Sequence, residues 1–384
     1  MNHLRKLTLI ASLAMACGMA NAQLKVGVTI PQTGPAAMLG LGQQKAMDFY
    51  GNKIGDISVQ YVTLDDASDT TGAVNNTKKL TSDEKVDVIV GSSSSPQCLA
   101  MLDAVAESET PQICLASSSA IVTPMDAKRK WVFKIPPNDA VWIEGITRHM
   151  ASQGMHKVAI IAFNDAFGEG WVKGINDLAP KYKLDVVSTE RYSRTDSSVV
   201  AQVIKVMATK PDAVVIAASG TPAALPTTTL RNRGFKGTIY LNASVATKEF
   251  FETAGAAAEG ALLTVGVGMV VDQVPDSNPL KKLNIDFRKR YEERYGPGTV
   301  NIFALQGYDA FRILQLAVPI AAKKAKPGTK EFRLALRDAM ETIKDLKGNT
   351  GIYNFSPTDH SGLDLRAVVM ARMDKGQLRY VDNN

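Results

Sequence analysis

The sequence predicts an α/β protein made of two doubly wound domains. The chain has 384 residues, of which 45% are hydrophobic and 21% are charged, so it is long enough for two domains with a core in each. Short runs of Val, Ile and Leu alternate with longer amphipathic segments, and this alternation occurs in two successive series. Apolar strands separated by helices are typical of a parallel sheet that is covered on both faces.

The first series of elements occupies the N-terminal third of the chain. Its expected strands are 24–30, 57–64, 86–90 and 112–116, and its expected helices are 36–50, 70–80 and 97–107. Each strand is short and rich in branched residues, whereas each helical segment has apolar residues at intervals of three and four. An extended break with two prolines, 135–139, follows this series.

The second series repeats the same pattern. Its expected strands are 157–163, 184–189, 213–218, 238–242 and 261–265, with helical segments between them. Two long helices, 279–295 and 302–322, follow, and we expect Pro319 to kink or end the second one because proline has no N–H to donate. Late strands are expected at 351–355 and 366–372.

Residues 1–22 have the three parts of a secretory signal peptide. Arg5 and Lys6 form a basic start, 7–15 is a short apolar run, and Ala20-Asn21-Ala22 provides small residues before the cut. We therefore expect cleavage before Gln23 and a periplasmic mature protein. In the alternative interpretation Cys17 is a lipoprotein cysteine, although residues 14–16 lack the usual Leu.

Charge and motif content exclude several other classes of protein. The net charge is +6 and dispersed along the chain, so no nucleic-acid partner is predicted. His149, His156 and His360 have no metal-ligand spacing with a cysteine, and no Gly-rich nucleotide motif or G-x-S-x-G elbow occurs, so we expect no metal and no cofactor. Cys98 and Cys114 form either a disulfide or two buried thiols.

Small hydroxyl residues follow three of the predicted strands. Ser92-Ser93-Ser94-Ser95 precedes Pro96, Ser117-Ser118-Ser119 follows the next strand, and Ser219-Gly220 follows a strand of the second series. Ser95 is expected to cap a helix that begins at Pro96. These serines are either only helix caps or, because ligands bind beyond the carboxyl ends of parallel strands, donors for an anion.

Several motifs, in the same order along the chain, resemble a known family. These are 27–36 (GVTIPQTGPA), 64–66 (LDD), 79–80 with 86–91 (KL and VDVIVG), 164–170 (NDAFGEG) and 307–310 (GYDA). Together they resemble the periplasmic solute-binding proteins of the branched-chain (Leu/Ile/Val) amino acid ABC importers, which have the type I periplasmic-binding fold.

This resemblance implies a specific architecture and role. Two Rossmann-like lobes joined by three hinge strands would close on a ligand and present it to an inner-membrane ABC permease with its ATPases, without chemistry and as a monomer. With the candidate crossings, lobe 1 would comprise 23–138 and 267–350, and lobe 2 would comprise 139–266 and 351–384.

The resemblance also implies ligand-binding positions. The carboxylate-holding serine of the family matches Ser94 or Ser95, and the next contacts fall on a run of three serines. The family's aromatic position, usually a tyrosine, is occupied by Phe167, which lacks the hydroxyl. The family's acidic residue, which binds the ligand's ammonium, falls near residues 242–244, where this chain has no acid. The remaining implied positions are Ser117, Ser118, Ser119, Phe167, Ser219, Gly220, Asn242 and Ser244.

The missing acid affects the expected ligand. A buried ammonium needs an anionic partner, and the stretch Asn242-Ala243-Ser244 contains no acid. We therefore expect a small carboxylate without an amine, with aromatic acids first. Branched-chain or other amino acids are the alternative, with Asp165 or Glu169 supplying the charge. Two further alternatives are a secreted hydrolase that uses a serine of 92–95 and a ligand-sensing receptor that does not take part in transport.

Overall fold

The structure is a computed structural model and describes residues 23–381. The predicted signal peptide, with its cleavage site and Cys17, lies outside the described residues. None of the helices in 23–381 has the length and apolarity needed to cross a membrane.

The first sheet contains six strands in the order β2-β3-β1-β4-β5-β6. Neighbours in this sheet pair in parallel, except that β2 runs antiparallel to β3. Its strands are β1 (Gln23–Ile30), β2 (Lys53–Ile54), β3 (Ile57–Asp65), β4 (Val88–Gly91), β5 (Gln112–Cys114) and β6 (Val132–Lys134). The strand order reverses between β1 and β4, and such a switch point is where doubly wound sheets bind ligands.

The second sheet contains seven strands in the order β15-β14-β11-β10-β9-β7-β8. Five strands pair in parallel, and β14 and β15 extend the sheet antiparallel. The strands are β7 (Lys157–Phe163), β8 (Asp185–Tyr192), β9 (Ala213–Ala217), β10 (Thr238–Leu241), β11 (Leu262–Gly266), β14 (Val368–Asp374) and β15 (Gln377–Val381). This sheet has its own switch point, between β7 and β9.

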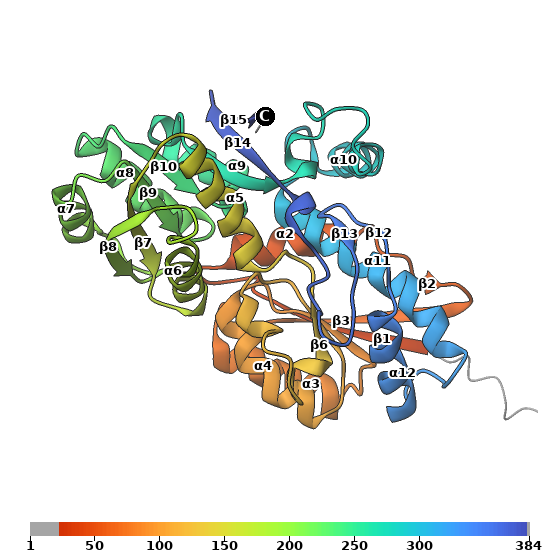
Figure 1. The fold of residues 1–384 in the computed structure, drawn as a ribbon. Helices are drawn as coiled ribbons and strands as arrows, with labels where there is room; N and C mark the ends of the chain where they lie inside the picture. Colours follow the sequence, from red (N-terminus) through yellow and green to blue (C-terminus); the bar gives the residue numbers. More distant parts are fainter. Residues whose placement is uncertain (1–22, 382–384) are drawn as a thin grey trace, which may run out of the picture.

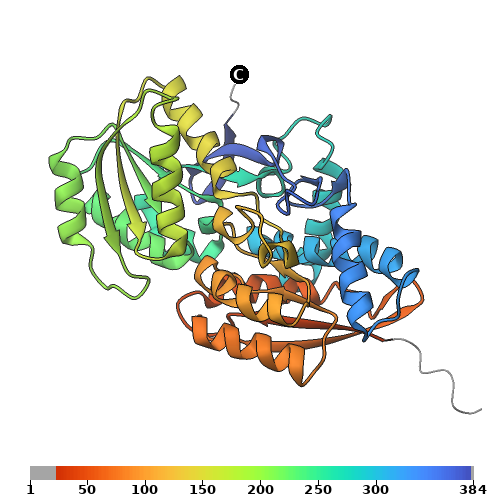
Figure 2. The same cartoon turned by 60° about the horizontal axis from the view of Figure 1, so that its bottom comes forward.

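Helices cover the two sheets, which form two separate lobes in Figures 1 and 2. With the first sheet lie α2 (Ala37–Met47), α3 (Thr70–Ser82), α4 (Ser95–Glu107), α11 (Ile302–Ala322) and α12 (Lys330–Glu341). With the second lie α5 (Asp139–Ser152), α6 (Ala166–Leu178), α7 (Val200–Ala208), α8 (Ala224–Asn232) and α9 (Lys248–Ala254). The remaining helix, α10 (Lys281–Tyr295), follows β11, and a small hairpin of β12 (Leu346–Lys347) and β13 (Ile352–Tyr353) precedes β14.

The chain passes between the two lobes three times. It leaves the first sheet after β6, leaves the second sheet after β11, and returns from β13 to β14. This arrangement confirms the predicted fold class, an α/β protein with two doubly wound lobes joined by three connections.

The bounds of some predicted elements differ from the structure. The break 135–139 was expected to be extended throughout, but Asp139 already begins α5 because Asn138 has the extended backbone of a cap residue. Helix α11 has the predicted bounds, Ile302–Ala322, and Pro319 lies exposed in its last turn. The late strand 351–355 is reduced to the two residues of β13.

Cys98 of α4 and Cys114 of β5 form a disulfide, which decides between the two alternatives left open by the sequence. Both sulfurs belong to a buried cluster between α3, α4 and the first sheet. The bond ties the helix whose N-terminus faces the second lobe to the strand beneath it.

Candidate functional site

A cavity lies between the lobes where the two switch points face each other. It contains about 500 Å³ of space unoccupied by atoms, part of which is open to solvent. Most of its lining residues lie just beyond the carboxyl ends of strands, and the others lie on helices. They are Leu39, Ser93, Ser94, Ser95, Leu115, Ala116, Ser117, Pro136, Trp142, Phe167, Trp171, Arg194, Ser219, Asn242, Ala243, Ser244, Phe303 and Gln306.

The first lobe contributes the N-terminus of α4 to this cavity. Gly91 ends β4 with φ +120°, and a Cβ there would lie 1.8 Å from the Thr29 carbonyl oxygen, so only glycine permits this turn. The loop that follows is anchored by Ser92, whose hydroxyl donates to the buried Asp66 at 2.6 Å. Burial raises the pKa of Asp66 to about 6, and the Ser92 bond acts in the opposite direction.

The structure corrects the predicted cap of α4. Ser94, not Ser95, is the cap residue, because its backbone is extended whereas Ser95 is already helical. The Ser94 hydroxyl donates to the Gln97 side chain instead of accepting from a backbone amide. The Ser95 hydroxyl is buried and has no hydrogen-bond partner, and the first amides of a helix have no acceptor within it. Ser94 and Ser95 are both among the residues that line the cavity.

Ser117 is held by Lys134, a residue that does not line the cavity. Its carbonyl accepts from the buried Lys134 ammonium, which also contacts the Ser118 carbonyl at 3.3 Å and Asn138 Oδ1 at 2.7 Å. Burial lowers the pKa of Lys134 to about 7, opposed by Asp139 and Asp359. The Lys134 amine is thus placed directly behind the serine loop.

The second lobe contributes a positively charged side chain. Arg194, just after β8, pairs with Asp165 at 2.6 Å and stacks over the Phe163 ring, with 4.2 Å between guanidinium and centroid. Its Nη1 donates to the Ser219 hydroxyl at 2.8 Å. Because Ser219 accepts this bond, its own proton remains free to be donated into the cavity.

The Asn242 side chain occupies the position where the family's acid was expected. Its Nδ2 donates to the Ala218 carbonyl at 2.7 Å, and its Oδ1 accepts from the Ser244 amide at 3.0 Å and from the Ser244 hydroxyl. Asn242 therefore fixes the short turn after β10, and no carboxylate is among the residues that line the cavity.

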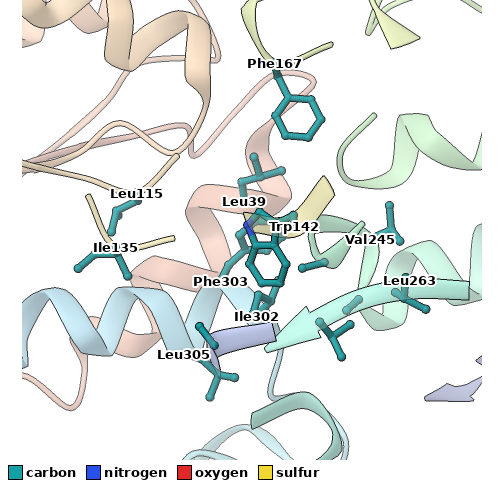
Figure 3. Close-up of a cluster of buried hydrophobic side chains, with 14 of the residues drawn as sticks. Leu39, Leu115, Ile135, Trp142, Phe167, Val245, Leu263, Ile302, Phe303 and Leu305 are labelled. Carbon is teal, nitrogen blue, oxygen red and sulfur yellow. The ribbon is translucent and has the colours of Figure 1, made fainter. Parts of the chain in front are cut away.

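Aromatic and aliphatic side chains form the rest of the cavity wall. In Figure 3, Leu39, Trp142 and Phe303 lie together at the centre, and the Phe167 ring points toward them. Trp171 follows Phe167 by one helical turn on α6, with 6.1 Å between the ring centroids. These residues come from both lobes, so a molecule between them would contact flat apolar surface on several sides.

The lobes also contact each other beside the cavity. The Thr247 hydroxyl lies 3.0 Å from the Met38 sulfur across the lobes. Gly220 has φ +64°, and a Cβ there would lie 3.3 Å from Met38 and 3.4 Å from Leu39. The two switch points are therefore closed on each other in this structure.

The structure brings most, but not all, of the predicted site residues to the cavity. Ser94, Ser95, Ser117, Phe167, Ser219, Asn242 and Ser244 line it, whereas Ser118, Ser119 and Gly220 do not. Both acids proposed as a shifted ammonium partner are engaged elsewhere. Asp165 pairs with Arg194 and caps α6, and Glu169 pairs with Arg191 on the surface.

Sequence reasoning missed Arg194 and the tryptophans of the cavity. Strand β8 was expected to end at residue 189 but continues to Tyr192, so Arg194 was not recognised as a residue at a strand end. Trp171 had a usable signal, because it lies four residues after Phe167 and therefore on the same face of α6. No histidine is among the lining residues.

The family model described as periplasmic binding protein matches residues 23–377. The chain belongs to the periplasmic binding protein family. An extracellular ligand-binding receptor from Rhodopseudomonas palustris HaA2 is 42% identical, with a TM-score of 0.90 over 94% of this chain and all of that one. This membership confirms the family and the type I fold predicted from the sequence.

More distant relatives of this periplasmic binding protein share its fold. An ABC transporter solute-binding protein from R. palustris, solved with benzoate, is 23% identical with a TM-score of 0.80, over 94% of this chain and 95% of that one. LivJ from Streptococcus pneumoniae, solved with isoleucine, is 20% identical with a TM-score of 0.78, over 93% and 97%.

The curated relatives are much longer proteins. Glutamate receptor 2.1 of Arabidopsis thaliana is 23% identical over 324 residues, which are 81% of this chain and 33% of that protein. The chain thus spans about a third of the length of the curated relatives it matches.

Proposed function

We propose that this protein is the extracytoplasmic receptor of an ABC importer and that it binds a small carboxylate without an amine, with aromatic acids preferred. The observation that carries this proposal is the composition of the cavity wall. It contains serine hydroxyls, a helix N-terminus, one guanidinium and several aromatic rings, but no carboxylate. Such a wall favours an anion with a flat apolar body.

The balance of charges supports an acid over an amino acid. A zwitterion would bring an ammonium next to Arg194, while both nearby acids are already paired, and an unpaired buried ammonium is costly. A carboxylate instead finds the unpartnered Ser95 hydroxyl and the free Ser219 proton. The benzoate complex of the R. palustris protein shows that the same fold accommodates an aromatic acid.

Transport and location follow from the family and the predicted signal peptide. We propose export to the periplasm, closure of a lobe comprising 23–138 and 267–350 on one comprising 139–266 and 351–384, and delivery of the unchanged ligand to an inner-membrane permease with its ATPases. The three connections between the sheets are compatible with hinge closure.

A thermal-shift screen of the purified protein tests the ligand class. We expect benzoate or another aromatic acid to raise the unfolding temperature, whereas Leu, Ile, Val and aliphatic dicarboxylates do not. At about 100 times its Kd a ligand stabilises by about 2.7 kcal/mol. Stabilisation by amino acids alone would reject the proposed ligand class, and conversion of the ligand to a product would reject a pure binding role.

A further inference from the structure

Asp139 is a buried carboxylate that the proposed binding role does not yet use. It is the first residue of α5 and 2% exposed, and neither of its side-chain oxygens has a hydrogen-bond partner. Helix α6 approaches it closely, since a Cβ on Gly170 would lie 2.9 Å from Asp139 Oδ2. A buried carboxylate without partners is costly, so its surroundings should contain donors.

Trp171 provides a matching donor. Its ring lines the cavity, its side chain is 1% exposed, and its indole nitrogen is buried without a partner. Burial raises the pKa of Asp139, whereas the charge of Lys134 and the neighbouring donors of Ser117, the Ser119 amide and the Trp171 indole lower it. An indole N–H can only donate and an ionised carboxylate can only accept, so the two unpartnered groups complement each other.

Ser117 reaches the same carboxyl from the other lobe. Its hydroxyl also faces Asp139, and its carbonyl accepts from the Asp139 amide at 3.2 Å. Lys134, fully buried, donates to the same carbonyl. The ammonium and the carboxylate thus flank Ser117, and their opposite charges offset part of the cost of burying each of them.

We propose that Asp139, supported by the charge of Lys134, is a positioning residue for the ligand cavity. Its carboxylate accepts hydrogen bonds from the Trp171 indole and the Ser117 hydroxyl, and it thereby fixes an aromatic wall of one lobe against a polar wall of the other. The role in binding rests on the proposed function, whereas the contact between Asp139 and Trp171 does not, because α5 and α6 pack in the same lobe.

The contact can be tested without any ligand. The chain contains three tryptophans, so a ¹⁵N spectrum has three indole signals, of which Trp171→Phe removes and thereby assigns one. In the wild-type protein we expect the Trp171 proton downfield of a free indole, and Asp139→Asn should move it upfield while Trp131 and Trp142 stay in place. Glu169→Gln, which neutralises an exposed acid on α6, the helix of Trp171, should leave all three indole signals in place.

Either of two results overturns the contact. One is a wild-type Trp171 signal at the position of a free indole, which needs no variant at Asp139 to fold. The other is an Asp139→Asn protein that is folded and has an unmoved Trp171 signal.

The positioning role is tested by calorimetric titration with benzoate. We expect Asp139→Asn to weaken binding about tenfold, because an amide presents N–H groups to donors where the carboxylate only accepts. In a protein that already carries Trp171→Phe, the same change should have a smaller effect, since the two residues act through one contact. Equal effects in both backgrounds, or none, would reject the role. A wild-type protein that binds none of the screened acids would instead reject the proposed function, and the indole spectra would still decide the contact.

Discussion

The two lobes contribute different kinds of polar groups to the cavity. The first lobe uses neutral donors, namely serine hydroxyls and the N-terminus of α4, with Lys134 hidden behind them. The second lobe uses a charged side chain, Arg194, which is only 15% exposed and is held by Asp165. Neutral donors at a helix end avoid the desolvation cost of a buried charge, whereas a guanidinium adds strength but needs a partner to hold it in place. The polar groups of the first lobe (the first wall of the cavity) are therefore held in place by covalent and backbone structure. Those of the second lobe (the second wall) are held by an ion pair.

The largest expected effect concerns the disulfide that ties α4, whose N-terminus is part of the first wall, to β5. The Cys98–Cys114 disulfide closes a loop of 16 residues in sequence separation, and a loop of that size stabilises the folded state by about 3 kcal/mol. We expect Cys98→Ala/Cys114→Ala to lower the free energy of unfolding in urea by about that amount. Reductant should lower the wild-type value similarly and leave the double variant unchanged. An equal response of both proteins to reductant would show that the disulfide has no such role.

The next effect concerns the second wall. Arg194→Met removes the guanidinium from the cavity, and we expect benzoate affinity to fall by about 2 kcal/mol, roughly 30-fold, as for hydrogen bonds to charged groups. Arg191→Met is the matched control, because Arg191 lies in β8, three residues before Arg194, but pairs with Glu169 on the surface. If calorimetry gives the same loss for both variants, Arg194 does not contact the anion and the second wall is only structural.

The serines of the first wall should contribute less than Arg194, because each bond is neutral. We expect Ser94→Ala/Ser95→Ala to weaken benzoate binding by about 1.5 kcal/mol, roughly tenfold. Ser108→Ala, at the far end of α4, serves as the control, since its hydroxyl only donates to the Val105 carbonyl. Unchanged affinity in the double variant would place the carboxylate at the second wall alone.

The first wall could be predicted from the sequence more fully than the second wall. The first wall follows from local rules, since a buried strand, a serine run and a proline mark a strand end and a helix start within a few residues. Even there the cap was placed one residue late, because the helix begins at Ser95, one residue before the proline. The alternation of strands and helices gave both lobes, but the antiparallel strands β14 and β15 join the second sheet from more than 100 residues away along the chain.

The second wall depends on contacts that are distant in sequence. Arg194 meets Asp165 across 29 residues and Ser219 across 25, and neither separation has a local signature. The same holds for Asp139 and Trp171, whose relation exists only once α5 and α6 pack. Predicted strand ends locate hydroxyls well, but a paired charge can be assigned to a site only when both partners are placed.

The smallest expected effect distinguishes an aromatic ligand from any apolar acid. Phe167→Leu keeps the apolar wall but removes the ring, and an aromatic pair contributes about 1 kcal/mol beyond burial of area. We expect benzoate to bind roughly fivefold more weakly to the variant, consistent with that energy, whereas cyclohexanecarboxylate, which has a saturated six-membered ring and no π system, should bind about equally to both proteins. Trp142 and Trp171 remain in the variant, which is why the loss should be modest. If calorimetry shows the same loss for both acids, Phe167 acts through packing alone, and the preference for aromatic acids must then come from the two tryptophans.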